Sequence, residues 1–99
     1  MSSLSQSFLI QVSPQPFTDT VCVSAKSTEK EPASIYVYNE YGVAVYRSEL
    51  MLNPGINTTD IILEECPPGV YYLHYKTPVS KLFVIRRIEK RHMMSSALD

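Results

Sequence analysis

The sequence predicts an all-β protein, an immunoglobulin-like β-sandwich of about seven antiparallel strands. Short segments in which apolar and polar residues alternate recur along the chain, and turn-forming residues separate them at intervals of about 8–12 residues. No stretch before residue 88 keeps the apolar spacing of a helix. Two sheets are expected, because one open sheet would leave half of the valine and isoleucine side chains in water.

Alternation and turn residues define the individual strands. The first strand ends where Pro14 and Pro16 interrupt it, and the third and fourth strands are joined by a turn in which Gly42 can take a positive φ angle. The fifth strand ends before the turn sequence Pro67-Pro68-Gly69. The predicted strands are residues 8–13, 18–25, 33–39, 43–50, 57–63, 70–77 and 80–87.

The length of the chain, 99 residues, corresponds to one domain. A hydrophobic content of 44% and a charged content of 19% exclude a chain that is disordered throughout. Residues 1–7 are expected to be a disordered N-terminal segment, residues 8–87 the sandwich domain, and residues 88–99 a basic, frayed C-terminal tail.

One face of each strand is expected to form the core, and the other face to lie outside. The expected core is Ile10, Val12, Val21, Val23, Ile35, Val37, Val45, Ile61, Leu63, Tyr71, Leu73 and one parity of residues 82–85. The same alternation sends five aromatic side chains to the opposite face, namely Tyr36, Tyr38, Tyr46, Tyr72 and His74.

These five side chains form one candidate binding face if residues 33–39, 43–50 and 70–77 are neighbouring strands. Two interpretations stay open. The rings can form a cross-strand aromatic ladder that stabilises the sheet. Alternatively, they can bind a protein or a glycan, because tyrosine combines apolar area with a polar tip.

The charge is small overall but unevenly distributed. A net charge of −1 argues against a nucleic-acid partner. However, residues 76–99 hold six bases and two acids, whereas residues 1–75 hold three bases and eight acids. The basic end of the chain is interpreted either as charge that guards a solvated edge strand or as a docking strip for an acidic partner.

Several classes of function lack their sequence signals. No apolar run approaches the ~18–20 residues that a membrane-spanning helix needs, and the start shows neither the basic nor the apolar region of a signal peptide. No nucleophile elbow or glycine-rich phosphate loop occurs, so we expect no enzyme and no cofactor. His74 and His92 lack metal-ligand spacing, and Cys22 and Cys66 are expected to be separate thiols.

Four motifs, in order, give the chain a family resemblance. Pro14-Gln15-Pro16-Phe17 stands where that family has a proline-asparagine-proline turn, and Asn39-Glu40-Tyr41-Gly42 stands where it has an acid-x-x-glycine turn. Pro67-Pro68-Gly69-Val70-Tyr71 matches a proline-x-glycine-x-tyrosine segment, although Cys66 precedes it in place of leucine. Lys81 matches a lysine that opens the last strand.

Over about residues 8–87, the chain thereby resembles the type IX secretion C-terminal sorting domains of Bacteroidetes proteins, and related small immunoglobulin-like β-sandwich modules of the same bacteria. The positions that carry the resemblance are Pro16, Phe17, Asn39, Gly42, Pro67, Gly69, Tyr71 and Lys81.

The resemblance implies a non-catalytic module that acts through protein–protein contacts during export or at the cell surface. It also implies the export machinery or a surface protein as partner, and a secreted or cell-surface location. Two alternatives stay open. One is a stand-alone protein- or glycan-binding module that uses the exposed tyrosine face, and the other is a purely structural module.

Overall fold

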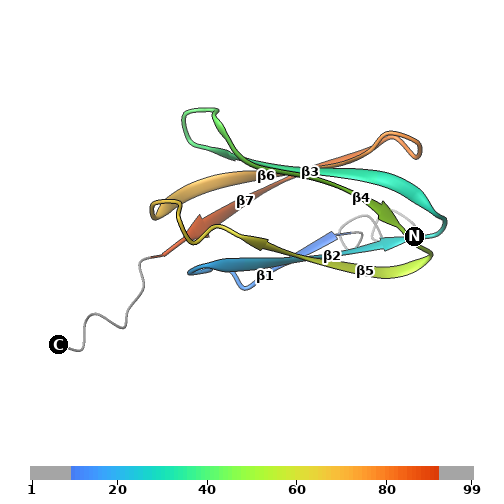
Figure 1. Ribbon diagram of the computed structural model, residues 1–99, viewed down its shortest axis with the longest axis horizontal. Coiled ribbons are helices and arrows are strands. Elements are labelled where there is room, and N and C mark those ends of the chain that lie inside the picture. Colours follow the sequence, from blue (N-terminus) through green and yellow to red (C-terminus); the bar gives the residue numbers. More distant parts are fainter. Residues whose placement is uncertain (1–9, 92–99) are drawn as a thin grey trace, which may run out of the picture.

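The computed structural model describes residues 10–91 and shows two sheets packed face to face (Figure 1). One sheet has the strand order β1-β2-β5 and the other has the order β4-β3-β6-β7. The strands are β1 (Ile10–Ser13), β2 (Thr20–Ser27), β3 (Glu31–Asn39), β4 (Ala44–Leu52), β5 (Gly55–Ile62), β6 (Gly69–Thr77) and β7 (Leu82–Lys90). All pairs of neighbouring strands are antiparallel, so the predicted seven-stranded antiparallel sandwich is confirmed.

The core lies between the inner faces of the two sheets. Its buried hydrophobic side chains are Ile10, Phe17, Val21, Val23, Ala25, Ala33, Ile35, Val37, Leu52, Ile61, Leu63, Tyr71, Leu73, Tyr75 and Ile88. Most of the expected core is confirmed, but Val12 and Val45 are only partly buried. Phe17, Leu52 and Ile88 lie at or beyond the ends of the predicted strands, where alternation carries little information. Within residues 10–91 no helix is long and apolar enough to cross a membrane.

The segment after β1 crosses from the three-stranded sheet to the four-stranded one. The Phe17 amide donates a hydrogen bond of 3.0 Å to the carbonyl of Glu89, and the Arg91 amide donates one of 2.7 Å to the carbonyl of Phe17. These bonds form a short parallel bridge to Lys90. The end of β7 is therefore covered by the chain itself.

Lys90 closes this end of the sandwich. It is 6% exposed, and its ammonium group donates hydrogen bonds to the carbonyl oxygens of Leu63 at 2.6 Å, Glu64 at 3.2 Å and Cys66 at 2.6 Å. A lysine ammonium has three donors, so all of them are used. The contacts tie β7 to the connection between β5 and β6.

The predicted boundary of the C-terminal tail at residue 88 is wrong, because β7 continues to Lys90 and Ile88 is fully buried. The charged residues around Ile88 hide the alternation of apolar and polar side chains in the sequence. A lysine can still occupy an inward position in a strand when carbonyl oxygens bind its ammonium group. The other parts of the two predicted terminal segments, residues 1–7 and 92–99, lie outside the described residues.

Glu31 closes the opposite end. It is also 6% exposed, and its carboxylate accepts two hydrogen bonds of 3.2 Å from Ser80, one from the amide and one from the hydroxyl. The Ser80 hydroxyl is also 2.8 Å from the Thr77 hydroxyl. The start of β3 is thereby joined to the turn between β6 and β7.

Candidate functional site

The motif residues Asn39 and Gly42 shape the hairpin between β3 and β4. The side-chain oxygen Oδ1 of Asn39 accepts hydrogen bonds of 2.9 Å from the amides of both Tyr41 and Val43. Gly42 has φ 83°, a conformation that side chains disfavour. In the acid-x-x-glycine turn that this motif resembles, an aspartate oxygen supplies the acceptor. The amide oxygen of an asparagine can accept the same hydrogen bonds, so the turn forms although Asn39 replaces the acid.

The motif residues Pro67, Gly69 and Tyr71 shape the entry into β6. The Tyr71 hydroxyl donates a hydrogen bond of 2.5 Å to the Pro67 carbonyl, and Gly69 has φ 149°. Burial, followed by the neighbouring Cys66 thiol, raises the pKa of the Tyr71 hydroxyl above its ordinary value of 10.0. The phenol therefore stays protonated and donates at neutral pH.

Three of the four motifs meet at one end of the sandwich. Asn39 pairs with Tyr71 in the sheet, Gly69 pairs with Lys90, and Phe17 bridges to Lys90. Pro16 is exposed beside the buried Phe17. These residues shape one end of the fold through contacts with one another.

Lys81, the fourth motif position, lies at the other end of the sandwich. It is exposed, has φ 61° and immediately precedes β7. Its side chain is therefore free to meet a partner, which the buried motif residues are not.

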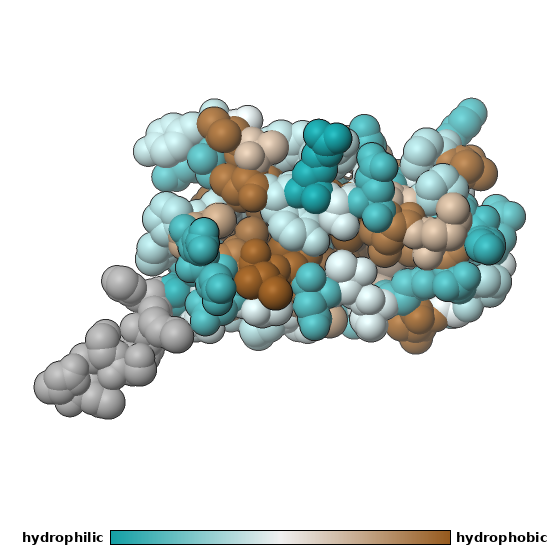
Figure 2. Space-filling view, viewed as in Figure 1, coloured by the Kyte–Doolittle hydropathy of each residue, from teal (hydrophilic) through white to brown (hydrophobic). Residues whose placement is uncertain are grey.

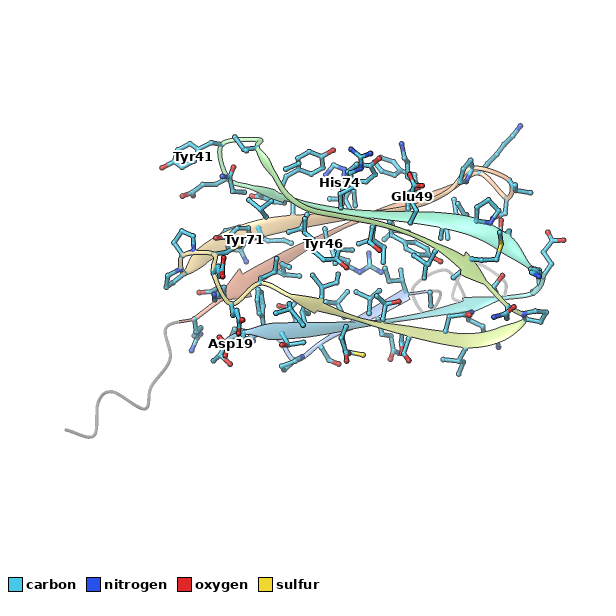
Figure 3. All side chains as sticks on the ribbon, viewed as in Figure 1. Asp19, Tyr41, Tyr46, Glu49, Tyr71 and His74 are labelled. Carbon is cyan, nitrogen blue, oxygen red and sulfur yellow. The ribbon has the colours of Figure 1, made fainter. Side chains whose placement is uncertain are left out.

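The predicted tyrosine face exists on the outer side of the four-stranded sheet. β4, β3 and β6 are neighbours as expected, and Tyr36 lies opposite His74 while Tyr38 lies opposite Tyr72. The Tyr36 and Tyr38 rings are stacked with centroids 6.1 Å apart, and the Tyr38 and His74 rings are 4.6 Å apart. The register places the four side chains on one face of the sheet, and Figure 3 shows His74 on its outer side.

The prediction that Tyr46 belongs to this face is wrong. Tyr46 pairs with Val37, whose side chain is fully buried, and it packs against the core (Figure 3). The cause is an irregularity between Val37 and Tyr38, after which Tyr38 pairs with Ala44, so that Val45 is an additional residue in β4. One extra residue in a strand reverses which side chains face inward.

Three further side chains complete the surface, which we call the outer aromatic face: Tyr36, Tyr38, Tyr72, His74, Arg47, Phe83 and Ile85. Phe83 and Ile85 are 55% and 49% exposed. The Phe83 ring lies 5.6 Å from the His74 ring, and the Arg47 guanidinium lies 6.0 Å from the centre of the Tyr36 ring. Contacts thus run across all four strands.

Phe83 and Ile85 were missed as site residues because either parity of residues 82–85 could have faced inward. The register decides this, since Phe83 lies opposite the exposed Lys76, and Ile85 lies opposite His74. On the side of the molecule that Figure 2 presents, hydrophobic side chains reach the surface in separate groups between hydrophilic ones. Position in the sheet, rather than hydropathy alone, therefore defines the outer aromatic face.

Cations surround the part of this face that belongs to β7. Lys76 and Arg87 lie on the outer side of the sheet, and Lys81 immediately precedes β7. Among the described residues, the only ion pair joins Arg91 to Glu89, at 3.9 Å. These three cations are thus not paired with carboxylates of residues 10–91.

The two cysteines are separate thiols in the structure. Cys22 in β2 and Cys66 between β5 and β6 are both free. Burial, with a smaller effect of the neighbouring Asp60 carboxylate, raises the pKa of the Cys22 thiol and disfavours the reactive thiolate. Within residues 10–91, no three histidine, cysteine or acidic side chains are grouped to hold a metal ion.

Fold and surface together define a small two-sheet β-sandwich that presents an aromatic, basic face. No curated protein and no solved structure matches the chain. The family model described as the secretion system C-terminal sorting domain matches residues 11–88. The chain therefore belongs to the family of type IX secretion C-terminal sorting domains.

Membership assigns the chain a coarse role. The family is one of secretion signals and not of catalysts, and such a signal interacts with the secretion machinery. The family also implies export, with a secreted or cell-surface fate. The match begins within β1 and ends within β7, so it includes residues of all seven strands.

Proposed function

We propose that this domain is a non-catalytic sorting module that the type IX export machinery recognises in its folded form, through protein–protein contacts. The observation that supports this most strongly is the family match over residues 11–88. The match extends over both sheets and is not confined to a short terminal peptide. A signal of that extent is suited to recognition as a folded surface.

The positions of the motif residues also favour a folded signal. Phe17 and Tyr71 are buried, and Asn39 uses its side chain within its own turn. Buried groups cannot be read directly by a partner, so these residues act by fixing the shape of the domain. Contact with the partner must then be made by exposed groups elsewhere.

We propose the outer aromatic face as the region of contact, with a protein rather than a glycan as partner. Exposed Phe83 and Ile85 continue the tyrosine rows onto β7, and Arg47 and Arg87 border them. Aromatic side chains with arginine are the composition that protein interfaces favour. The same rings also stabilise the sheet, by about 0.2–1 kcal/mol for each cross-strand pair.

The full chain fused behind a secreted reporter tests this function in a host that has type IX secretion. The reporter is expected at the cell surface. A matched fusion carrying Ile88→Asp places a charge in the core, so it is expected to unfold the module and leave the reporter in the periplasm. Retention of the reporter in the periplasm behind the unmodified, folded module would reject the sorting function.

Point substitutions are preferable to deletion of residues 80–87 in this experiment. Leu82 and Val84 pack against the core, so a deletion would remove folding and any recognition surface together. Substitutions on the outer side of β7 separate the two effects.

A further inference from the structure

The edge of β7 has two parts, one covered and one open. Beside the covered part, Phe17 pairs with Glu89 and Arg91, and the Gln15 side chain donates a hydrogen bond of 3.4 Å to the Arg87 carbonyl. The backbone groups of Arg87, Glu89 and Arg91 that take part in these bonds point away from β6. Because the backbone groups of successive residues in a strand alternate in direction, the amides and carbonyls of Phe83 and Ile85 point away from β6 as well.

Nothing in the described chain pairs with this open part. β7 is the last strand of its sheet, and no hydrogen bond from residues 10–91 reaches the outward backbone groups of Phe83 or Ile85. Unpaired edge groups are a template on which another extended segment can add a strand.

The open part is also the apolar part. It has the sequence Leu82-Phe83-Val84-Ile85, whereas Arg86, Arg87 and Glu89 lie toward the end that residues 15–17 cover. A sheet edge is normally protected by charges at its centre. The other edge of the same sheet has this protection, because its strand β4 carries Arg47 and Glu49 on the outer face.

Charge distinguishes between the two kinds of segment that could add here. If a second copy paired its β7 antiparallel around Val84, Phe83 would face Ile85, but Lys81 would face Arg87 at both ends. Like charges placed opposite each other in a sheet are unfavourable. A segment with carboxylates at both ends of an apolar centre would instead pair favourably with both cations.

We propose that the open edge of β7 is completed by an extended, acid-flanked segment of a partner protein, which adds one strand to the four-stranded sheet. This inference rests on the proposed sorting function, because it assigns the partner to the export machinery. The added segment pairs with the backbone of Phe83 and Ile85, places apolar side chains beside theirs, and sets its carboxylates near Lys81 and Arg87.

Ile85→Pro tests strand addition, because proline removes an outward amide and leaves the hydrogen bonds to β6 in place. The matched control is Glu49→Pro, which by the same alternation removes an outward amide from the other edge of the same sheet. With the reporter fusion, we expect Ile85→Pro to lower surface delivery at least about tenfold. Glu49→Pro is expected to deliver as the unmodified module does, and the melting temperatures of the two variants are expected to agree.

A second pair of variants tests the chemistry of the segment. Lys81→Glu with Arg87→Glu is expected to reduce delivery about as strongly as Ile85→Pro, whereas Glu49→Arg leaves it unchanged. Sedimentation of the unmodified chain is expected to show a monomer at micromolar concentration.

Each other outcome overturns a distinct statement. If the unmodified fusion is delivered and Ile85→Pro is delivered equally well, strand addition at β7 is wrong while the sorting function stands. If charge reversal has no effect, the segment is not acid-flanked. A dimer that Ile85→Pro dissociates would assign the edge to a second copy. If the unmodified fusion stays in the periplasm, the sorting function fails and this inference fails with it.

Discussion

The inner and outer faces of β7 differ in what they contact. On the inner face, Ile88 is fully buried and the Lys90 ammonium group binds three carbonyl oxygens of the neighbouring loop. On the outer face, Phe83 and Ile85 are about half exposed. The pleat of the strand separates the two sets of side chains, so one strand can hold the fold together and still present a surface to a partner. The comparison predicts that substitutions on the two faces affect different measurements.

The largest loss of stability is expected for Ile88→Ala. The side chain lies in the core, so its truncation is expected to lower the free energy of unfolding by about 2–5 kcal/mol. Ile85→Ala, on the outer face of the same strand, is the matched control and is expected to change it by no more than about 0.5 kcal/mol. Urea denaturation of both variants measures the difference. Equal losses would show that the two faces of β7 are not distinct.

Lys90→Met is expected to cost about 1–3 kcal/mol of unfolding free energy, since it leaves the carbonyls of Leu63, Glu64 and Cys66 without their donor. Methionine retains the apolar stem, so the change isolates the hydrogen bonds. Arg87→Met on the exposed side is the control and is expected to be near neutral. If the two variants melt at the same temperature, Lys90 does not hold this end of the sandwich.

A substitution at Gly69, which pairs with Lys90 in the sheet, tests the same end of the sandwich by changing the preferred backbone conformation. An added Cβ would meet no atom within 4 Å, so Gly69→Ala acts only through its φ of 149°. We expect a loss of about 1 kcal/mol, measured by urea denaturation. Val70→Ala is the neighbouring control without a positive φ. An unchanged Gly69→Ala variant would remove the physical reason for glycine in this motif.

The two buried tyrosines, Tyr71 and Tyr75, are expected to make the free energy of unfolding depend on pH. Burial raises the pKa of Tyr71, and burial followed by the Glu31 carboxylate raises that of Tyr75, above the ordinary value of 10.0. The folded state therefore favours the neutral phenols. Their contribution to stability is complete below pH 10 and is lost as the pH rises through the raised values.

Denaturant midpoints measured between about pH 8 and pH 11 should fall at the alkaline end. Tyr75→Phe, which cannot ionise there, should show a weaker fall than the unmodified chain. A midpoint that stays constant to the alkaline limit would contradict the assigned burial of these hydroxyls.

The smallest effect on stability is expected for Phe83→Ala, within about 0.5 kcal/mol, because the side chain is 55% exposed. Its effect on surface delivery of the fused reporter is expected to be a clear decrease. Met51→Ala on β4, which is also exposed, is the control for both measurements. Loss of stability without loss of delivery would show that Phe83 serves the fold alone.

Local patterns were enough to predict the architecture. Alternation located every strand, and Asn39-Glu40-Tyr41-Gly42 located a hairpin that the hydrogen bonds of Asn39 confirm. Tyr36 and Tyr38 lie on the outer side of the sheet as predicted, because the extra residue of the β3–β4 irregularity belongs to β4 and leaves the alternation along β3 unbroken.

The errors arose where pairing between strands overrides local alternation. The extra residue at Val45 turned Tyr46 inward, and no signal within residues 43–50 shows it. The covered end of β7 depends on Phe17, which is distant in sequence, so the extension of the strand to Lys90 was not visible. The register with β6 was also needed to place Phe83 and Ile85 on the outer face.

Crosslinking during export tests the central claim most directly, namely that the outer edge of β7 is the recognised part of the folded domain. A photoreactive amino acid is placed at Phe83 in one reporter fusion and at Glu49 in another, so that each occupies one edge of the four-stranded sheet. We predict that position 83 crosslinks to an acid-flanked segment of an export component and that position 49 does not. Equal crosslinking from both positions, or crosslinking from position 49 alone while the reporter reaches the surface, would contradict this claim.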